Sequence, residues 1–260
     1  MSEYQYIKLA IDDKGIAVLT LNRPERYNAF HQDMVDEWYD ALQKVANNPG
    51  ANVVIVTGAG KAFCAGGDVD EMTKFIDQNS LDRKNFLWEH VHRIALTLER
   101  LDRPVIAALN GTARGAGLDM ALMCDIRIAA KSAVFAESYI NMGLPPGDGG
   151  TYYLPRLIGV GRALEMFWTA KEITAEEAER YGMVNRVVPD GEAFNAAYEL
   201  ALKIVSQPQQ AIRFTKRALY QSLTSGLAMH LDMISSHMSV LEDMPDFKKK
   251  LDAFKSRKAK

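Results

Sequence analysis

The chain has 260 residues, of which 48% are hydrophobic and 25% charged, and its formal net charge is −2. This composition is typical of a globular protein with a sizeable core, and the weak net charge gives no field that would recruit nucleic acid or an anionic membrane. No apolar run approaches the ~20 residues that cross a bilayer, and Met1 leads into a strand-like segment without a signal pattern. The sequence therefore predicts a cytoplasmic protein.

Short strands alternate with helices along the first two thirds of the chain. The predicted strands are rich in β-branched or aliphatic residues and are bounded by Gly, Pro or Asn. They are Tyr6–Ile11, Ile16–Asn22, Val53–Thr57, Val105–Leu109 and Ile126–Ala129. Apolar residues at helical spacing predict helices over His31–Val45 and Leu81–Leu101. This alternation indicates an α/β body with at least partly parallel strands.

The last third of the chain is predicted to be helical. Thr174 and Glu177 form a capping box, and Pro245 begins a final segment. The predicted helices are Ala163–Thr169, Ala175–Tyr181, Gly191–Ser206, Gln209–Ser222 and Leu227–Leu241. We therefore expect a core over residues 1–190 and a helical C-terminal region over residues 191–260.

Motifs of several other enzyme classes are incomplete. The segment Gly58-Ala59-Gly60-Lys61 lacks both the first glycine and the final hydroxyl residue of a phosphate-binding loop. The segment Gly115-Ala116-Gly117 is followed by Met120, where a dinucleotide-binding fingerprint has its third glycine. No serine lies in a Gly-x-Ser-x-Gly turn. Nucleoside triphosphate chemistry, hydride transfer and serine hydrolysis are thereby disfavoured.

The cysteines and the paired histidines give no sign of a metal site. Cys64 and Cys124 lack the spacing of metal ligands and lie among small or apolar residues, so we expect two inert core thiols. His90 and His92 lie two residues apart on a predicted helix, so they should face different ways and make a poor metal pair. We therefore expect no metal ion at these residues.

Two loops rich in small residues, Lys61–Met72 and Asn110–Met120, each follow a predicted strand. Glycine lets a ligand approach the backbone closely, and a helix that starts in such a loop offers unpaired N–H groups and the positive end of its dipole. Either loop alone could be only a tight turn. Together, each with a carboxylate after its glycines (Asp68 and Asp119), they indicate a site for an oxygen that becomes negatively charged.

These loops resemble the signatures of the enoyl-CoA hydratase/isomerase, or crotonase, family. The similar segments are Ala62–Val69 and Asn110–Arg127, and Leu21–Ala29 and Pro145–Arg156 match as well, in order along essentially the whole chain. The resemblance implies an α/β spiral of β-β-α turns with a helical C-terminal region that trimerises, commonly as a dimer of trimers. It also implies an acyl-CoA substrate bound by residues 1–190, without a further cofactor.

The resemblance also implies the roles of individual residues. The N–H groups of Gly67 and Ala116 would form an oxyanion hole for the thioester carbonyl, where removal of one such donor costs ~3–4 kcal/mol. The backbone of Ala65, Asp68 and Val69 would contact the nucleotide end of coenzyme A. Phe247 and Lys250 match residues that also pack on the nucleotide in relatives, often from a neighbouring subunit.

The sequence departs from the family pattern at the acid–base residues. Hydratases of the family use two glutamates, and Asp119 and Tyr139 stand at the matching positions. A phenol can donate a proton but is a poor base at neutral pH. The missing carboxylate could come from Asp148, whose alternative role is to cap a loop. It could also come from Glu137, whose alternative role is a structural acid bound to backbone or to Arg127.

Thioester hydrolysis and decarboxylation would use the same oxyanion hole and stay open, but the sequence favours three other functions. The first is hydration of a trans-2-enoyl-CoA, with Asp119 activating water. The second is movement of a double bond in an enoyl- or dienoyl-CoA. The third is non-catalytic binding of an acyl-CoA, suggested by the loss of a carboxylate at Tyr139. None of them involves nucleic acid or a membrane.

Overall fold

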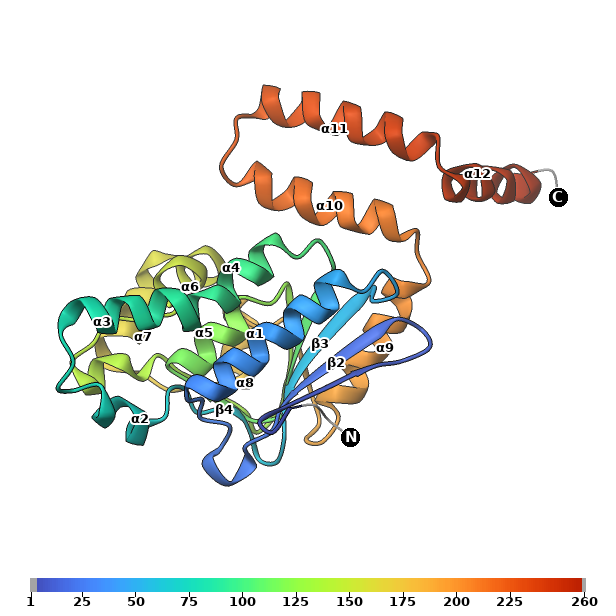
Figure 1. The fold of residues 1–260 in the computed structure, drawn as a ribbon. Helices are drawn as coiled ribbons and strands as arrows, with labels where there is room; N and C mark the ends of the chain where they lie inside the picture. The colour runs from blue at the N-terminus through green and yellow to red at the C-terminus, as the bar shows by residue number, and fades with distance from the viewer. Residues whose placement is uncertain (1–3, 259–260) are drawn as a thin grey trace.

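The computed structural model describes residues 4–258 and contains two β-sheets (Figure 1). The larger sheet has the order β1-β2-β3-β5-β7-β10. Only β1 runs antiparallel to its neighbour, and the other neighbouring strands are parallel. Its strands are β1 (Ile7–Ile11), β2 (Ile16–Leu21), β3 (Val53–Gly58), β5 (Val105–Leu109), β7 (Ile126–Ala130) and β10 (Arg186–Val188).

A smaller sheet collects the second strand of each repeating unit, in the order β4-β6-β8-β9. Successive turns of the chain place β3 then β4, β5 then β6, and β7 then β8, so each turn adds one strand to each sheet before its helices. This is the predicted spiral of β-β-α turns, and the fold prediction is confirmed. The small-sheet strands are β4 (Ala62–Cys64), β6 (Thr112–Arg114), β8 (Val134–Ala136) and β9 (Ile173–Thr174).

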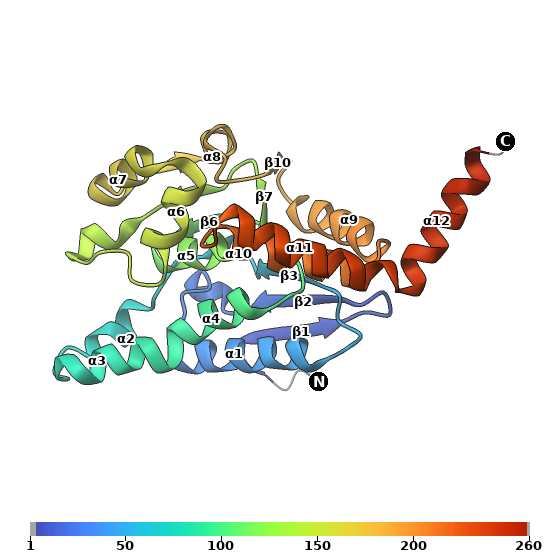
Figure 2. The same cartoon turned by 90° about the horizontal axis from the view of Figure 1, so that it is seen from above.

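Helices cover both faces of the larger sheet (Figure 2). On one face, α1 (Gln32–Asn47) buries Val35, Trp38 and Leu42, which recur at helical spacing, in the main core. On the other face, α9 (Ala193–Val205) packs Ala197 and its neighbours against the strands. The strands between them are apolar on both faces, as buried parallel strands are.

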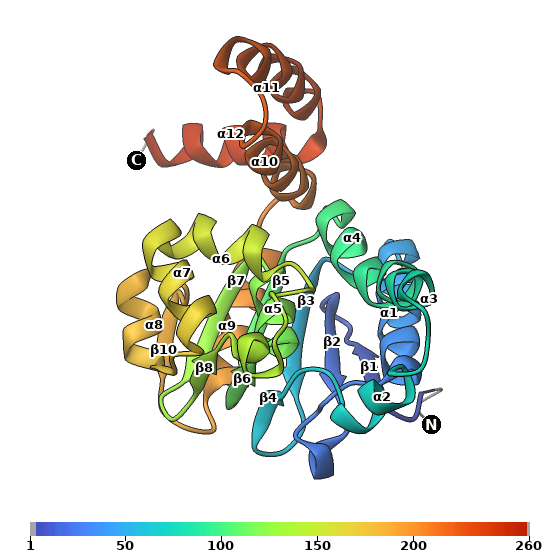
Figure 3. The same cartoon turned by 90° about the vertical axis from the view of Figure 1, so that its left-hand side faces the viewer.

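The predicted helix over Leu81–Leu101 is interrupted. It consists of α3 (Ser80–Phe86), a π-helical turn (η2, Leu87–Val91) and α4 (His92–Arg100). The remaining helices of the core surround the smaller sheet and the loops (Figure 3). They are η1 (Pro24–Arg26), α2 (Val69–Lys74), α5 (Ala116–Leu122), η3 (Ser138–Met142), α6 (Gly150–Ile158), α7 (Val160–Thr169) and α8 (Ala175–Tyr181), where the predicted capping box is present.

Three C-terminal helices stand away from the core as an arm (Figure 1). They are α10 (Gln209–Ser222), α11 (Leu227–Glu242) and α12 (Pro245–Lys258). Asp125 ties α10 to the core, because it accepts hydrogen bonds from Lys216 Nζ and from the Tyr220 hydroxyl, both at 2.7 Å. Within residues 4–258, no helix is both long enough and apolar enough to cross a membrane.

Candidate active site

Strand pairing in the small sheet brings the two predicted loops together. β4 and β6 are parallel neighbours, with Ala62 opposite Thr112, so the loops that follow them leave the sheet side by side. A Cβ atom on Gly66 would lie 2.9 Å from the Arg114 carbonyl oxygen, and one on Gly117 would lie 2.2 Å from that of Cys64. The two backbones therefore touch, and only glycine allows this approach.

Two asparagines of the family-like segments fix β4 in place. The Asn28 side chain donates to the carbonyl oxygens of Ala59, Ala62 and Phe63 at 2.9–3.1 Å. The Asn110 amide donates to Ala62 at 3.1 Å, and its oxygen accepts from the Gly58 N–H at 3.0 Å. Backbone polar groups that the short strands leave unpaired are thus satisfied.

The N–H groups of Gly67 and Ala116 belong to these adjoining loops. Ala116 is the first residue of α5, where an N–H has no partner within its own helix. Gly67 pairs with Phe30 in an isolated β-bridge. The Phe30 N–H donates to the Gly66 carbonyl, and the Asp68 N–H donates to the Phe30 carbonyl. Among the residues that the structure describes, neither N–H has a hydrogen-bond acceptor. Both are the groups expected to form an oxyanion hole, and that role stays a prediction.

Asp119, Tyr139 and Asp148 are brought together as a hydrogen-bonded cluster. The Tyr139 hydroxyl lies 2.7 Å from Asp119 Oδ2 and 3.1 Å from Asp148 Oδ2. The backbone N–H of Asp148 donates to the same Asp119 oxygen at 3.1 Å. A phenol has one proton, so these two carboxylates share it. Asp119 lies one helical turn after Ala116 on α5, and the two therefore share a helix face.

Glu137 is a completely buried fourth member of the cluster. Arg127 instead donates to the carbonyls of Met183, Leu122 and Cys124, so the suggested pairing of Glu137 with Arg127 is wrong. A Cβ on Gly150 would lie 2.3 Å from Asp119 Oδ1 and 3.1 Å from Glu137 Oε1, which places both carboxyl groups over that glycine. Among the described residues, neither carboxyl oxygen of Glu137 has a hydrogen-bond partner, and Asp119 Oδ1 has none either.

Burial sets the proton affinities of this cluster. It raises the pKa of Asp119 to about 6, although the Tyr139 hydrogen bond acts in the opposite direction. Burial, followed by the charge of Asp119, raises the pKa of Glu137 well above its ordinary value. The pKa of Tyr139 is raised by burial and by the carboxylates of Asp119 and Asp148. These shifts favour the protonated forms of Glu137 and Tyr139, whereas a pKa of about 6 leaves Asp119 mainly as a carboxylate at pH 7.

The buried carboxyl groups should make the protein less stable as the pH rises. Between the ordinary value of 3.8 and about 6, folded Asp119 holds a proton that the unfolded chain has lost, which costs on the order of 3 kcal/mol over that interval. Glu137 extends the fall to higher pH. Glu137→Gln has no proton to lose, so it should lose less stability than the parent between pH 5 and 8. Urea unfolding across this range measures both curves, and parallel curves would contradict the assignment.

The chain is similar in sequence and in fold to proteins of one family. The family model for enoyl-CoA hydratase/isomerase matches residues 12–260. The chain belongs to that family. It is 38% identical to a short-chain-enoyl-CoA hydratase of Clostridium acetobutylicum, over 93% of this chain and 95% of that protein. It is 33% identical to a 1,2-epoxyphenylacetyl-CoA isomerase of Escherichia coli, over 95% and 94% respectively. The crystal structure of an enoyl-CoA hydratase from Bacillus anthracis superposes with a TM-score of 0.89 at 36% identity, covering 97% of each chain.

The residues predicted to meet coenzyme A fall into two groups. Ala65 and Val69 are exposed beside the glycine loop, and the Ala65 N–H donates to Tyr27. Asp68 is buried as the N-cap of α2 and lies 2.5 Å from Arg23. Burial would raise the pKa of Asp68, but the Arg23 hydrogen bond and charge outweigh it and lower that pKa. Its backbone N–H and C=O are both used within the chain, which leaves its predicted nucleotide contact untested.

Phe247 and Lys250 form the second group and lie on α12, at the opposite end of the molecule from α2 (Figures 1 and 2). In this arrangement they cannot meet a nucleotide held beside Val69 of the same chain. A neighbouring subunit of an enoyl-CoA hydratase/isomerase assembly would have to bring them there.

The side chains predicted to be inert or unsuited to metal binding have structural partners. Burial raises the pKa of Cys64 and of Cys124 to about 12, which keeps both thiols protonated. His90 Nδ1 lies 2.8 Å from Asp36 Oδ1 on α1, whereas His92 faces the loop before α6. The two histidines therefore face different ways, as expected.

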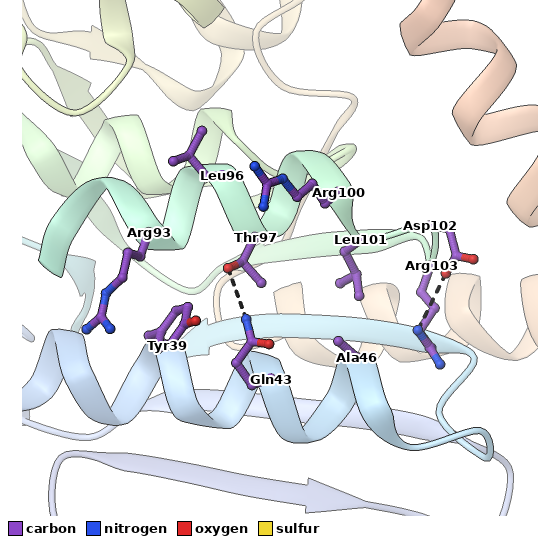
Figure 4. A pocket seen from close by; sticks show the side chains of 10 residues that line it. All are labelled: Tyr39, Gln43, Ala46, Arg93, Leu96, Thr97, Arg100, Leu101, Asp102 and Arg103. Carbon is purple, nitrogen blue, oxygen red and sulfur yellow. Dashed lines mark hydrogen bonds and ion pairs between the residues drawn. The ribbon is translucent and has the colours of Figure 1, made fainter. Parts of the chain in front are cut away.

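A cavity of about 490 Å³ lies between α1 and α4, away from the cluster of Asp119, Tyr139 and Asp148 (Figure 4). Gln43 bridges its two walls by donating to the Thr97 hydroxyl at 3.3 Å, while Leu96 and Arg100 point away from α1. Arg103 is held by backbone carbonyls of Ala51 and Asn48. None of the predicted site residues lines this cavity.

Proposed function

We propose that the protein adds water to a short-chain trans-2-enoyl-CoA. The observation that carries this proposal is the Asp119 carboxylate, one helical turn from the Ala116 N–H and joined through Tyr139 to Asp148. A pKa of about 6 for Asp119 suits a general base at neutral pH. The C. acetobutylicum relative, named a short-chain-enoyl-CoA hydratase, supports a short acyl chain.

The first step forms an enolate. The thioester oxygen accepts hydrogen bonds from the N–H groups of Gly67 and Ala116, which polarises the conjugated double bond. Asp119 removes a proton from water as the water oxygen bonds to the β-carbon. The electron pair of the double bond moves toward the thioester oxygen, and the two N–H groups stabilise the charge that develops there.

The second step returns the proton to the substrate. Tyr139 is partly exposed and its hydroxyl is hydrogen-bonded to Asp119, so we assign delivery of the proton to the α-carbon to the phenol. Tyr139 gives its proton to the α-carbon of the enolate and regains one from Asp119 across the 2.7 Å hydrogen bond. One H and one OH have then been added, and every side chain is back in its starting state. No cofactor takes part in this sequence.

Incorporation of solvent oxygen tests the proposal. Incubation with crotonyl-CoA in water enriched in ¹⁸O should give 3-hydroxybutyryl-CoA that carries the label at its β-hydroxyl group. Binding of crotonyl-CoA without a labelled product would reject hydration. Exchange of the α-proton with deuterated water then separates another enolate-forming reaction from non-catalytic acyl-CoA binding.

Double-bond isomerisation is the second candidate, and Asp148 favours it. A second carboxylate at the Tyr139 hydroxyl gives the site two proton-holding positions joined by one phenol, which a proton shuttle between two carbons needs. The E. coli relative is named an isomerase. A 3-enoyl-CoA converted to its 2-enoyl isomer without uptake of ¹⁸O would favour this activity.

We further propose that the enzyme works in the cytoplasm as a trimer or a dimer of trimers, with residues 191–260 as its assembly region. On the arm, several apolar side chains are more than half exposed: Leu219, Leu223, Leu227, Met229, Leu231 and Met238. Their burial between subunits would offset the cost of exposing them. It would also carry Phe247 and Lys250 to a neighbouring site. Light scattering in solution should give three or six times the chain mass, and a monomeric mass would reject the assembly.

A further inference from the structure

His92 stands at the start of α4, directly after the π-helical turn. Its backbone N–H donates to the Leu87 carbonyl across five residues. Such a turn holds one residue more than an α-helical turn and changes the direction of the side chains that follow it. The interruption of the predicted helix therefore sets where His92 faces, and π-helical turns occur frequently at functional sites.

The His92 ring contacts the loop that carries Asp148. His92 Nε2 lies 3.0 Å from the Gly147 carbonyl oxygen and 3.6 Å from Asp148 Oδ1. Because a carbonyl can only accept, Nε2 carries a proton. The Trp88 ring, from the π-helical turn, meets the His92 ring edge-on with centroids 6.2 Å apart.

Asp148 is the charged group that faces His92, and the other titratable groups of the cluster lie behind it. They come from two elements: Asp119 from α5, and Glu137 and Tyr139 from the segment around η3. The nearby Asp148 carboxylate, followed by the Gly147 carbonyl, raises the pKa of His92, and burial acts in the opposite direction. An imidazolium here would be a cation beside three carboxyl groups, and would lower the proton affinity of the cluster as a whole.

We propose that His92 is a positioning residue, which anchors the Gly147–Gly150 loop to α4 and supplies a positive charge beside the carboxyl cluster. The proposal rests on the proposed function for its effect on turnover. The loop that His92 contacts also touches Asp119, the proposed base, because the Asp148 N–H donates to Asp119 Oδ2 at 3.1 Å. A displaced loop would move the carboxylate that activates water. A lost positive charge would raise the proton affinity of the whole cluster.

The kinetic test uses His92→Gln, which keeps a donor for Gly147 but removes the charge. We expect kcat for crotonyl-CoA to fall about 10-fold with little change in KM. The acid limb of kcat/KM should move about one pH unit higher. His92→Lys keeps a cation and should restore the acid limb. His90→Gln is the matched control, since His90 pairs with Asp36 on α1. A His92→Gln profile equal to that of the parent would overturn the proposal.

A titration by nuclear magnetic resonance needs no turnover and separates this proposal from the proposed function. In the parent protein the His92 ring should titrate above its ordinary value, and Asp148→Asn should lower the titration midpoint while leaving that of His90 unchanged. An unaltered His92 titration in Asp148→Asn would reject the pairing even if hydration is confirmed. An altered titration in a protein that adds no water would uphold the pairing and reject the hydratase assignment.

Discussion

Asp119→Asn should remove nearly all hydration of crotonyl-CoA, with kcat lowered about 10²- to 10⁴-fold. The amide has nearly the shape of the carboxylate but cannot take a proton from water. The residue is completely buried and its pKa lies near 6, so the substitution also removes a buried charge. We therefore expect the variant to fold and to bind a non-reactive acyl-CoA with an affinity close to that of the parent.

The matched control for this variant is Asp102→Asn, the same change at an acid in the cavity between α1 and α4. It should leave kcat unchanged. Steady-state kinetics and thermal unfolding of both variants separate loss of the base from loss of the fold. If a well-folded Asp119→Asn variant kept more than a tenth of the parent kcat, Asp119 would not be the base.

Ala116→Pro should lower kcat/KM at least about 10²-fold. Ala116 is the first residue of α5, a position at which helices accept proline because its N–H has no partner within the helix. The substitution therefore removes one proposed oxyanion donor and places a ring carbon where the thioester oxygen would bind. The measurement is hydration of crotonyl-CoA together with the unfolding temperature.

Gln32→Pro tests whether such a proline is harmful in itself. Gln32 is the first residue of α1 and belongs to neither glycine loop nor the Asp119–Tyr139–Asp148 cluster, so this variant should keep the parent activity. Full activity in a folded Ala116→Pro variant would mean that the Ala116 N–H does not meet the thioester oxygen.

The sequence predicts well those elements whose apolar pattern is long enough to be read. β5 and α10 have the predicted bounds, and α11 ends one residue later than predicted. The strands of the small sheet were not predicted, because Ala62–Cys64 and Thr112–Arg114 are too short to alternate. The helix α6 was missed as well, since it begins at Gly150 and contains Pro155, two residues that disfavour helices.

The candidate site was likewise predicted only in part. Asp119, Tyr139 and Asp148 were predicted as a group and lie within hydrogen-bonding distance of one another. Glu137 was considered as a source of the missing carboxylate, and it lies directly before η3, with its carboxyl group beside that of Asp119 over Gly150. His92 was considered only as half of a poor metal pair. The direction of the His92 side chain depends on the π-helical turn, and no residue pattern in Leu87–Val91 predicts such a turn.

The contact between the glycine loops has a consequence for how such a protein can change. Both proposed oxyanion donors are main-chain groups placed by the pairing of β4 with β6, so nearly every side-chain mutation leaves them intact. The residues proposed to carry protons in hydration or isomerisation are, by contrast, three side chains that a single codon change can each replace. Evolution, or a designer, could therefore alter the proposed reaction at positions 119, 139 and 148 while the proposed oxyanion donors are inherited unchanged.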